Sequence, residues 1–239
     1  MDNLHLDQHI SQQFNTDLEE LKTQLLEMGG VVEQQLSDAI AAIETADGDL
    51  AEKVLVIENE VDKREVALDE QAIAILARRQ PAASDLRMVL MATKITRDLE
   101  RIGDEAQKIA KMAIALNEEG ESPRGYVELR HIGKSVLRML NATLDAFARF
   151  DVDVALQVAQ DDKNVDREYK SAVRELVTYM MEDPRSISRV MNVMWALRSL
   201  ERIGDHARNI SEHIIFLVKG LDVRHISLKE MKRQVQENP

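Results

Sequence analysis

The sequence predicts an all-α protein made of two tandem three-helix bundles that are related by an internal repeat. The segment LERIGD occurs twice, at residues 99–104 and 200–205, an offset of 101 positions. Apolar residues recur at three- and four-residue steps along most of the chain, which is the period of an amphipathic helix. Aromatic residues make up only 3% of the chain, with 9 glycines and 4 prolines, a composition that favours helices over strands.

The first expected helix is long and ends near Gly48. Its apolar stripe consists of Leu18, Leu21, Leu25, Val32, Leu36, Ile40 and Ile43. The sequence Asp47-Gly48-Asp49 then interrupts the pattern, with Gly48 suited to a C-terminal cap. We expect Asp49 to be the N-cap of the next helix, because Glu52 follows at the position of a capping box.

The remaining helices follow from the chain breaks. The second helix runs to about Arg79, where Pro81 stops it, and the third carries LERIGD and ends near Asn117. The segment 118–125 (EEGESPRG) is the expected linker, and breaks near Asp151 and Pro184 divide the second repeat in the same way. The predicted domains are therefore 1–120 and 121–239, with an irregular tail after about residue 225.

The first half of each third helix is apolar on two sides. Leu86 and Leu90 lie opposite the main stripe in repeat one, as do Ile187 and Met191 in repeat two. We expect these residues to pack against the other repeat or against a second copy of the chain, so the pattern leaves both open.

Composition and motifs exclude several classes of protein. The chain has 43 acidic and 31 basic residues, a formal charge of −12, which argues against a general affinity for nucleic acid. It has no cysteine for a disulfide or a thiolate metal site, and no run that predicts a signal peptide or a membrane span. No nucleotide-binding loop or nucleophile motif is present, so no catalytic or organic-cofactor residue is assigned. We expect a soluble, cytoplasmic protein.

Acidic pairs spaced E/D-x-x-x-D recur at equivalent places in both repeats. Each pair lies one helical turn apart, on the second and third helices, where like charges are mildly unfavourable. Such carboxylates suit hard cations and are quite unlike a zinc site, and the absence of a Glu-x-x-His pair distinguishes them from ferritin-like di-iron sites. The candidate metal ligands are Glu58, Asp62, Glu100, Asp104, Asp162, Asp166, Glu201 and Asp205.

These residues also have structural interpretations. The acidic pairs can form a solvated face, with Arg97 and Arg101 making ordinary surface ion pairs. The glycine of each LERIGD costs about 1 kcal/mol relative to alanine within a helix, and it fits a close helix crossing as well as a metal role. His206 has no counterpart in repeat one and is interpreted as a surface or interface histidine rather than a ligand.

The doubled motifs resemble the PhoU family over essentially the whole chain. The resemblance rests on ERIGD at residues 100–104 and 201–205, RRQPAASDLR at 78–87, YMMEDPRSI at 179–187 and the four acidic pairs. It implies two three-helix bundles related by an approximate two-fold, a homodimer, and iron or another metal on the carboxylates. By their own chemistry the carboxylates suit divalent or ferric ions such as iron, manganese or magnesium.

The resemblance also implies a function. Members of the family are not enzymes; they restrain the phosphate transporter and keep the phosphate-starvation genes silent when phosphate is plentiful. The expected partners are the ATPase subunit of the phosphate ABC transporter and a phosphate-sensing histidine kinase, so the protein would be peripheral to the membrane and would not contact nucleic acid. The alternatives are a carboxylate-bridged metal-storage protein or metalloenzyme, and a purely structural scaffold.

Overall fold

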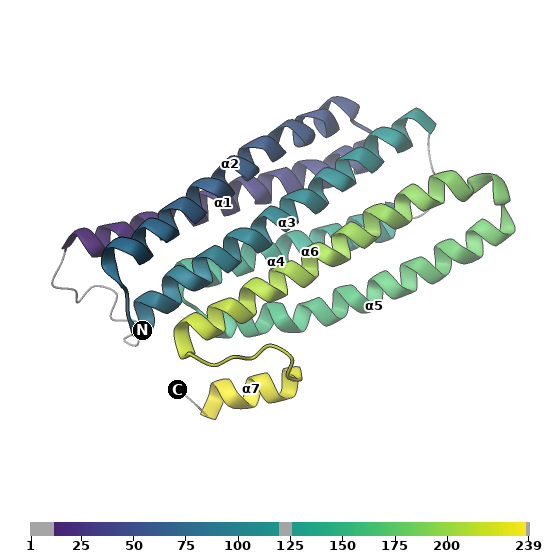
Figure 1. Ribbon diagram of the computed structural model, residues 1–239. Coiled ribbons are helices and arrows are strands. Elements are labelled where there is room, and N and C mark those ends of the chain that lie inside the picture. Colours follow the sequence, from purple (N-terminus) through teal and green to yellow (C-terminus); the bar gives the residue numbers. More distant parts are fainter. Residues whose placement is uncertain (1–11, 120–125, 238–239) are drawn as a thin grey trace.

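Two three-helix bundles lie side by side in the computed structural model, which describes residues 12–119 and 126–237 (Figure 1). The first bundle contains α1 (Gln12–Thr45), α2 (Gly48–Arg79) and α3 (Ala83–Glu119). The second contains α4 (Tyr126–Arg149), α5 (Val152–Glu182) and α6 (Ile187–Lys219), with a 3-10 turn at Pro184–Ser186 before α6. The chain continues to α7 (Leu228–Glu237). The expected linker residues 120–125 lie outside the described residues, whereas Glu118 and Glu119 belong to α3.

The first break in each repeat has the same backbone geometry. Ala46 and Phe150 adopt left-handed conformations, with φ of 53° and 54°, and an aspartate follows each of them. Asp47 Oδ1 accepts a hydrogen bond from Leu50 N at 2.9 Å, and Asp151 Oδ1 accepts one from Val154 N at 3.0 Å. The N-cap is therefore Asp47, one residue before the start of α2, and the predictions that Asp49 is the N-cap and that Gly48 ends the first helix are wrong.

The two bundles meet along α3 and α6, which make the most extensive contact between them, and also through a reciprocal contact between α1 and α4. A β-carbon built on Gly29 of α1 would lie 2.4 Å from Leu144 Cδ2 of α4, and one built on Gly133 of α4 would lie 3.2 Å from Ile40 Cγ2 of α1. Gly29 and Ile40 in the first repeat are equivalent to Gly133 and Leu144 in the second. The glycine of each repeat therefore packs against the aliphatic side chain of the other repeat. This reciprocity is what a two-fold axis between the repeats requires.

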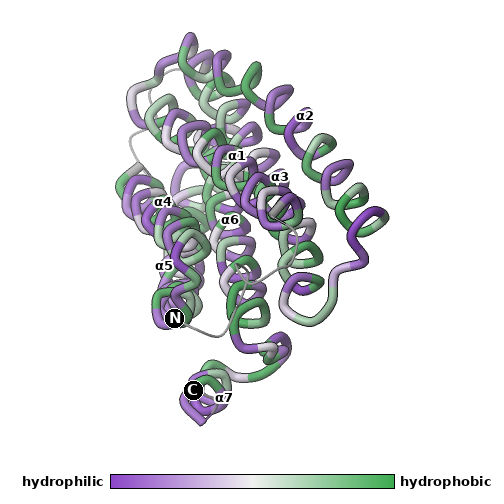
Figure 2. The backbone as a smooth tube through the Cα atoms, turned by 90° about the vertical axis from the view of Figure 1, so that its left-hand side faces the viewer, coloured by the Kyte–Doolittle hydropathy of each residue, from purple (hydrophilic) through white to green (hydrophobic). Residues whose placement is uncertain are grey.

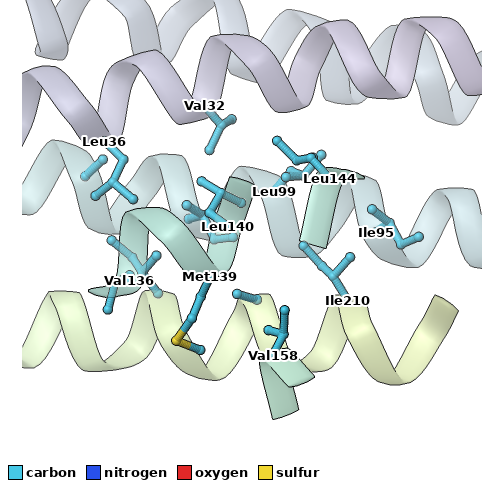
Figure 3. Packing of buried hydrophobic residues seen from close by; sticks show 14 of the residues in the cluster. Val32, Leu36, Ile95, Leu99, Val136, Met139, Leu140, Leu144, Val158 and Ile210 are labelled. Atoms are coloured by element: carbon cyan, nitrogen blue, oxygen red, sulfur yellow. The ribbon is translucent and has the colours of Figure 1, made fainter. Parts of the chain in front are cut away.

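A continuous apolar core fills the space between the helices. Figure 3 shows Val32 and Leu36 of α1 close to Leu140 of α4, with Ile95 and Leu99 of α3 nearby. All of these side chains are fully buried, and Ile210 brings α6 into the same cluster. Along each helix, hydrophobic and hydrophilic residues alternate, as an amphipathic pattern requires (Figure 2). The core is therefore shared by the two bundles.

The second apolar side of the third helices stays partly open. Leu90 of α3 is 41% exposed and Ile187 of α6 is 47% exposed, and Met191 is only partly buried. The expectation that these residues pack against the other repeat is therefore wrong for Leu90 and Ile187. Packing against a second copy of the chain stays a prediction.

The segment after residue 225 is not irregular throughout, contrary to the sequence prediction. It forms α7, whose N-terminus is capped by Ser227 Oγ, which accepts a hydrogen bond from Glu230 N at 3.2 Å. Met231 and Val235 are buried, and α7 contacts α5. The missed signal was Ser227 followed by Glu230, a capping box ahead of two apolar residues one turn apart.

The adjacent glycines of α1 provide a matched test of the packing between the bundles. No atom lies within 4 Å of a β-carbon built on Gly30, so Gly30→Ala should raise the free energy of unfolding by about 0.5 to 1 kcal/mol through helix propensity. Gly29→Ala gains the same propensity but must displace Leu144, so it should be less stable than Gly30→Ala by about 1 kcal/mol or more. Urea unfolding of both variants measures this difference, and an equal gain would show that α1 and α4 do not approach closely at Gly29.

Candidate functional site

Helices α2 and α3 bring the four predicted acids of repeat one to one edge of the first bundle. Glu58 is only 6% exposed, and the side chain of Glu100 is 13% exposed. Asp62 is exposed, and the side chain of Asp104 is 32% exposed. The first acid of each pair thus faces inward, and the second acid, one turn later, faces solvent.

The acids of repeat two have the same gradation on α5 and α6. Asp162 is 3% exposed, and the Glu201 side chain is 12% exposed. The side chain of Asp166 is 38% exposed, and Asp205 is exposed. We call the two groups the first cluster (Glu58, Asp62, Glu100 and Asp104) and the second cluster (Asp162, Asp166, Glu201 and Asp205).

Burial raises the pKa values of the inner acids Glu58 and Asp162. Desolvation, reinforced by the neighbouring Asp104, Asp62 and Glu100, raises the pKa of Glu58 to about 7, although the hydrogen bond from Gln35 opposes this. Desolvation also raises the pKa of Asp162 to about 6, with Arg208 acting in the opposite direction. The carboxylates within a cluster therefore lie close enough to repel one another.

Arginines neutralise part of each cluster. Arg101 Nη1 lies 3.0 Å from Asp104 Oδ2, and Arg198 Nη1 lies 2.7 Å from Glu201 Oε2. The solvated-face interpretation therefore suits the outer Asp104, whose partner is an exposed arginine. It does not suit Glu58 and Asp162, because these two carboxylates are buried rather than solvated.

The glycines of LERIGD lie against the inner acids. A β-carbon on Gly103 would be 3.2 Å from Glu58 Oε2, and one on Gly204 would be 3.6 Å from Asp162 Oδ1. The third helix therefore approaches the inner carboxylate closely at Gly103, whereas a β-carbon on Gly204 would make an ordinary van der Waals contact. The helix-crossing interpretation is supported for Gly103, where it agrees with a carboxylate cluster at the same place.

The donor set fits a hard cation, although the side chains do not surround one point. Every predicted ligand is a carboxylate, and Glu58 Oε1 is buried without a hydrogen-bond partner. Within residues 12–119 and 126–237, no three histidine, cysteine, aspartate or glutamate side chains are arranged to hold a metal ion. Binding would therefore require the outer carboxylates, such as those of Asp62 and Asp205, to rotate inward.

Two further residues contact the inner acids, and neither was predicted from the sequence. Gln35 of α1 is fully buried and donates from Nε2 to Glu58 Oε2 at 2.5 Å. Arg208 of α6 donates from Nη1 to Asp162 Oδ2 at 3.3 Å. Arg208 lies one turn after Gly204 on the same helix, so its contact with the second cluster could have been predicted from the sequence. The contact of Gln35 could not, because nothing in the sequence gives the register of α1 against α2.

A polar network joins the third helices of the two repeats. Asp98 of α3 lies 2.8 Å from His206 Nδ1 and 3.3 Å from His213 Nε2, both on α6. Arg202 of α6 lies 3.1 Å from the buried Glu105 of α3. The interface interpretation of His206 is confirmed, and the two histidines lower the pKa of Asp98 against the effect of its burial.

Two copies of one family model match this chain. The PhoU domain model matches residues 25–113 and 129–214, which correspond to the two bundles. The chain belongs to the PhoU family. The predicted resemblance and the predicted fold class of two three-helix bundles are both confirmed.

Relatives of this PhoU-family chain share nearly its whole length. It is 63% identical to the phosphate-specific transport system accessory protein PhoU homolog of Pseudomonas aeruginosa, over 98% of this chain and 96% of that protein. It is 48% identical to the phosphate-specific transport system accessory protein PhoU of Escherichia coli, over 98% and 96% of the two chains. The names of these relatives describe accessory proteins rather than enzymes.

Solved structures support the same fold. The crystal structure of PhoU from Pseudomonas aeruginosa superposes with a TM-score of 0.86 at 62% identity. The match covers 87% of this chain and 100% of that chain. The phosphate transport system regulatory protein PhoU from Streptococcus pneumoniae superposes with a TM-score of 0.81 at 30% identity, covering 88% and 99% of the two chains. The bundle arrangement is therefore shared with relatives of moderate identity.

The raised pKa of Glu58 predicts a stability change with pH in chelator-treated protein. An unfolded glutamate ionises near 4.5, whereas Glu58 in the folded chain ionises at about 7. Between these values the folded state binds more protons, so the free energy of unfolding should fall as pH rises. Glu58→Gln removes this cost and should be more stable than wild type at pH 8 by roughly 3 kcal/mol, since one pKa unit corresponds to about 1.4 kcal/mol.

The difference should shrink at pH 4.5, where Glu58 is protonated in the folded state and half protonated in the unfolded state. Urea unfolding of the two proteins at pH 4.5 and pH 8 measures it, with Glu60→Gln on the same helix as an exposed control. An equal difference at the two pH values would contradict the raised pKa.

Proposed function

We propose that this chain is a negative regulator of phosphate uptake and of the phosphate-starvation genes. The observation that carries the proposal is its similarity, through both repeats, to proteins named as accessory to phosphate-specific transport. The motif segments that first indicated the PhoU family lie within the two matched regions, residues 25–113 and 129–214. The regulator acts by binding other proteins rather than by catalysis.

The proposed partners are the ATPase subunit of the phosphate ABC transporter and a phosphate-sensing histidine kinase. Within the described residues, no helix of this chain is long and apolar enough to cross a membrane. We therefore propose that it acts from the cytoplasm and reaches the membrane through these partners. A stoichiometric regulator shifts a partner's equilibrium only if it binds one of the partner's states more tightly than the other.

Metal binding at the two carboxylate clusters forms part of the proposal. Its support is the donor set, the buried inner acids Glu58 and Asp162, and the unpaired Glu58 Oε1. A bound divalent or ferric ion would screen the repulsion between the carboxylates of a cluster. The alternative of a metal-storage protein or metalloenzyme requires uptake of many ions per chain, or turnover, by purified protein.

A homodimer is proposed on the exposed apolar surface of α5 and α6. Ile187 and Trp195 lie two turns apart on one face of α6 and are 47% and 57% exposed. Val177 and Met181, near the end of α5, are 40% and 79% exposed. Exposed apolar side chains on two helices in contact favour burial against a second copy.

Deletion of the gene should switch on phosphate-starvation genes in phosphate-rich medium. A reporter fused to such a promoter measures this, and the wild-type gene supplied in trans should silence it again. The double variant Asp62→Asn and Asp166→Asn should fail to silence it if metal is needed, whereas Asp69→Asn, an exposed acid on α2, should succeed. Unchanged expression in the deletion strain would remove the regulatory function.

Disruption of the apolar surface should convert the dimer into a monomer. Trp195→Glu places a charge on the surface of α6, and sedimentation equilibrium should give half the wild-type mass. Val56→Glu changes a side chain of α2 that is 69% exposed, and it should remain dimeric. A monomeric wild-type chain, or a dimer that tolerates Trp195→Glu, would contradict the proposed interface.

A further inference from the structure

The two carboxylate clusters are built on equivalent frames but differ at two positions. A β-carbon on Gly103 would lie 3.0 Å from Gln35 Oε1, and one on Gly204 would lie 3.8 Å from Met139 Cε. Gln35 and Met139 therefore occupy the same place in the two repeats, beside the inner acid. One repeat has a polar amide at this place and the other has a thioether.

Gln35 adds an oxygen to the first cluster. The residue is fully buried, and Nε2 is used by its hydrogen bond to Glu58. Gln35 Oε1 is also buried and has no hydrogen-bond partner, and the same holds for Glu58 Oε1. Gln35 Oε1 lies beside Gly103, and Glu58, whose Oε2 borders the same position, contributes the second unpaired oxygen of the first cluster. A hard cation satisfies unpaired oxygens of this kind.

In the second cluster a cation pairs with the inner acid, whereas in the first cluster Arg101 pairs with Glu100 and Asp104. The guanidinium of Arg208 bonds to Asp162 Oδ2 at 3.3 Å, and its Nε lies 3.1 Å from Glu212 Oε1. In the first repeat, the residue equivalent to Arg208 is Gln107 of α3. Gln107 carries no charge, and its Oε1 accepts a hydrogen bond from Lys111 Nζ at 2.6 Å.

We propose that the two clusters are unequal cation sites. The first cluster, with Gln35 Oε1 as an additional ligand, binds a hard divalent cation tightly. The second cluster binds it more weakly, because Arg208 competes for Asp162 and repels an incoming cation. This inference rests on the metal-binding part of the proposed function, and it concerns Gln35 and Arg208 rather than the carboxylate motifs themselves.

Titration of chelator-treated, full-length protein with Mn²⁺ tests the inequality. The electron paramagnetic resonance signal of free Mn²⁺ gives the bound fraction at each step. Wild type should show two classes of site whose dissociation constants differ at least tenfold. Glu58→Gln should remove the tight class, and Asp162→Asn should remove the weak one.

Exchanging the differing residues between repeats should exchange the affinities. Arg208→Gln should strengthen the weak class at least tenfold and leave the tight class unchanged. Gln107→Arg, or Gln35→Met, should weaken the tight class at least tenfold. Arg202→Gln is the matched control, because Arg202 pairs with Glu105 outside both clusters, and both affinities should persist. Circular dichroism and urea unfolding show whether each variant is folded.

Two results would overturn the inference while leaving metal binding intact. One is equal affinity of the two classes in wild type, and the other is an unchanged weak class in folded Arg208→Gln protein. If wild type and all variants bind no Mn²⁺, the inference fails together with the metal part of the proposal. The regulatory function is judged separately by the promoter reporter, so its failure is distinguishable.

Discussion

The packing of the two bundles against each other, α3 against α6 and α1 against α4, is the contact on which the rest of the architecture depends. Gly29 and Gly133 each receive an aliphatic side chain of the other repeat, so α1 and α4 pack at a distance that larger residues would prevent. The approach lets the two bundles share one core, in which α3 and α6 also meet. Helices α2 and α5 remain peripheral (Figure 1), and each therefore presents its outer acids to solvent.

The two repeats share one helix arrangement around the inner acid but surround that acid with different side chains. The inner acid, the glycine of LERIGD and a neighbouring valine keep their relative places, as Gly103 with Val61 and Gly204 with Val165 show. The side chains that complete the surroundings of the inner acid come from other helices, and these have diverged. A conserved backbone arrangement can therefore carry two carboxylates with different charge environments, as Glu58 and Asp162 illustrate.

The sequence predicted the helices well because their determinants are local. Pro81 and Pro184 ended helices at the expected places, and the apolar period identified the buried stripes. The N-cap was misplaced by two residues because Asp47 and Asp49 both suit a cap, and the left-handed Ala46 that decides between them has no sequence signature. The C-terminal helix was missed although its signal is local.

The surroundings of the candidate site were less predictable, because they depend on which helices face one another. The inner and outer positions within each acidic pair were not distinguished by spacing alone. Gln35 reaches Glu58 across the bundle, and periodicity gives the buried face of α1 without giving the register against α2. The pairing of Asp98 with His206 and His213 joins different repeats and has the same cause.

That pairing makes each half of the chain specific for the other. The repeat position of His206 is occupied by Glu105, and that of Asp98 by Ser199. Two first halves packed in this manner would set Glu105 against Asp98, a meeting of two acids, while two second halves would set His206 against a serine. At this contact the two halves are therefore complementary rather than identical, although they share one fold: each half pairs with the other as two different subunits of a heterodimer would.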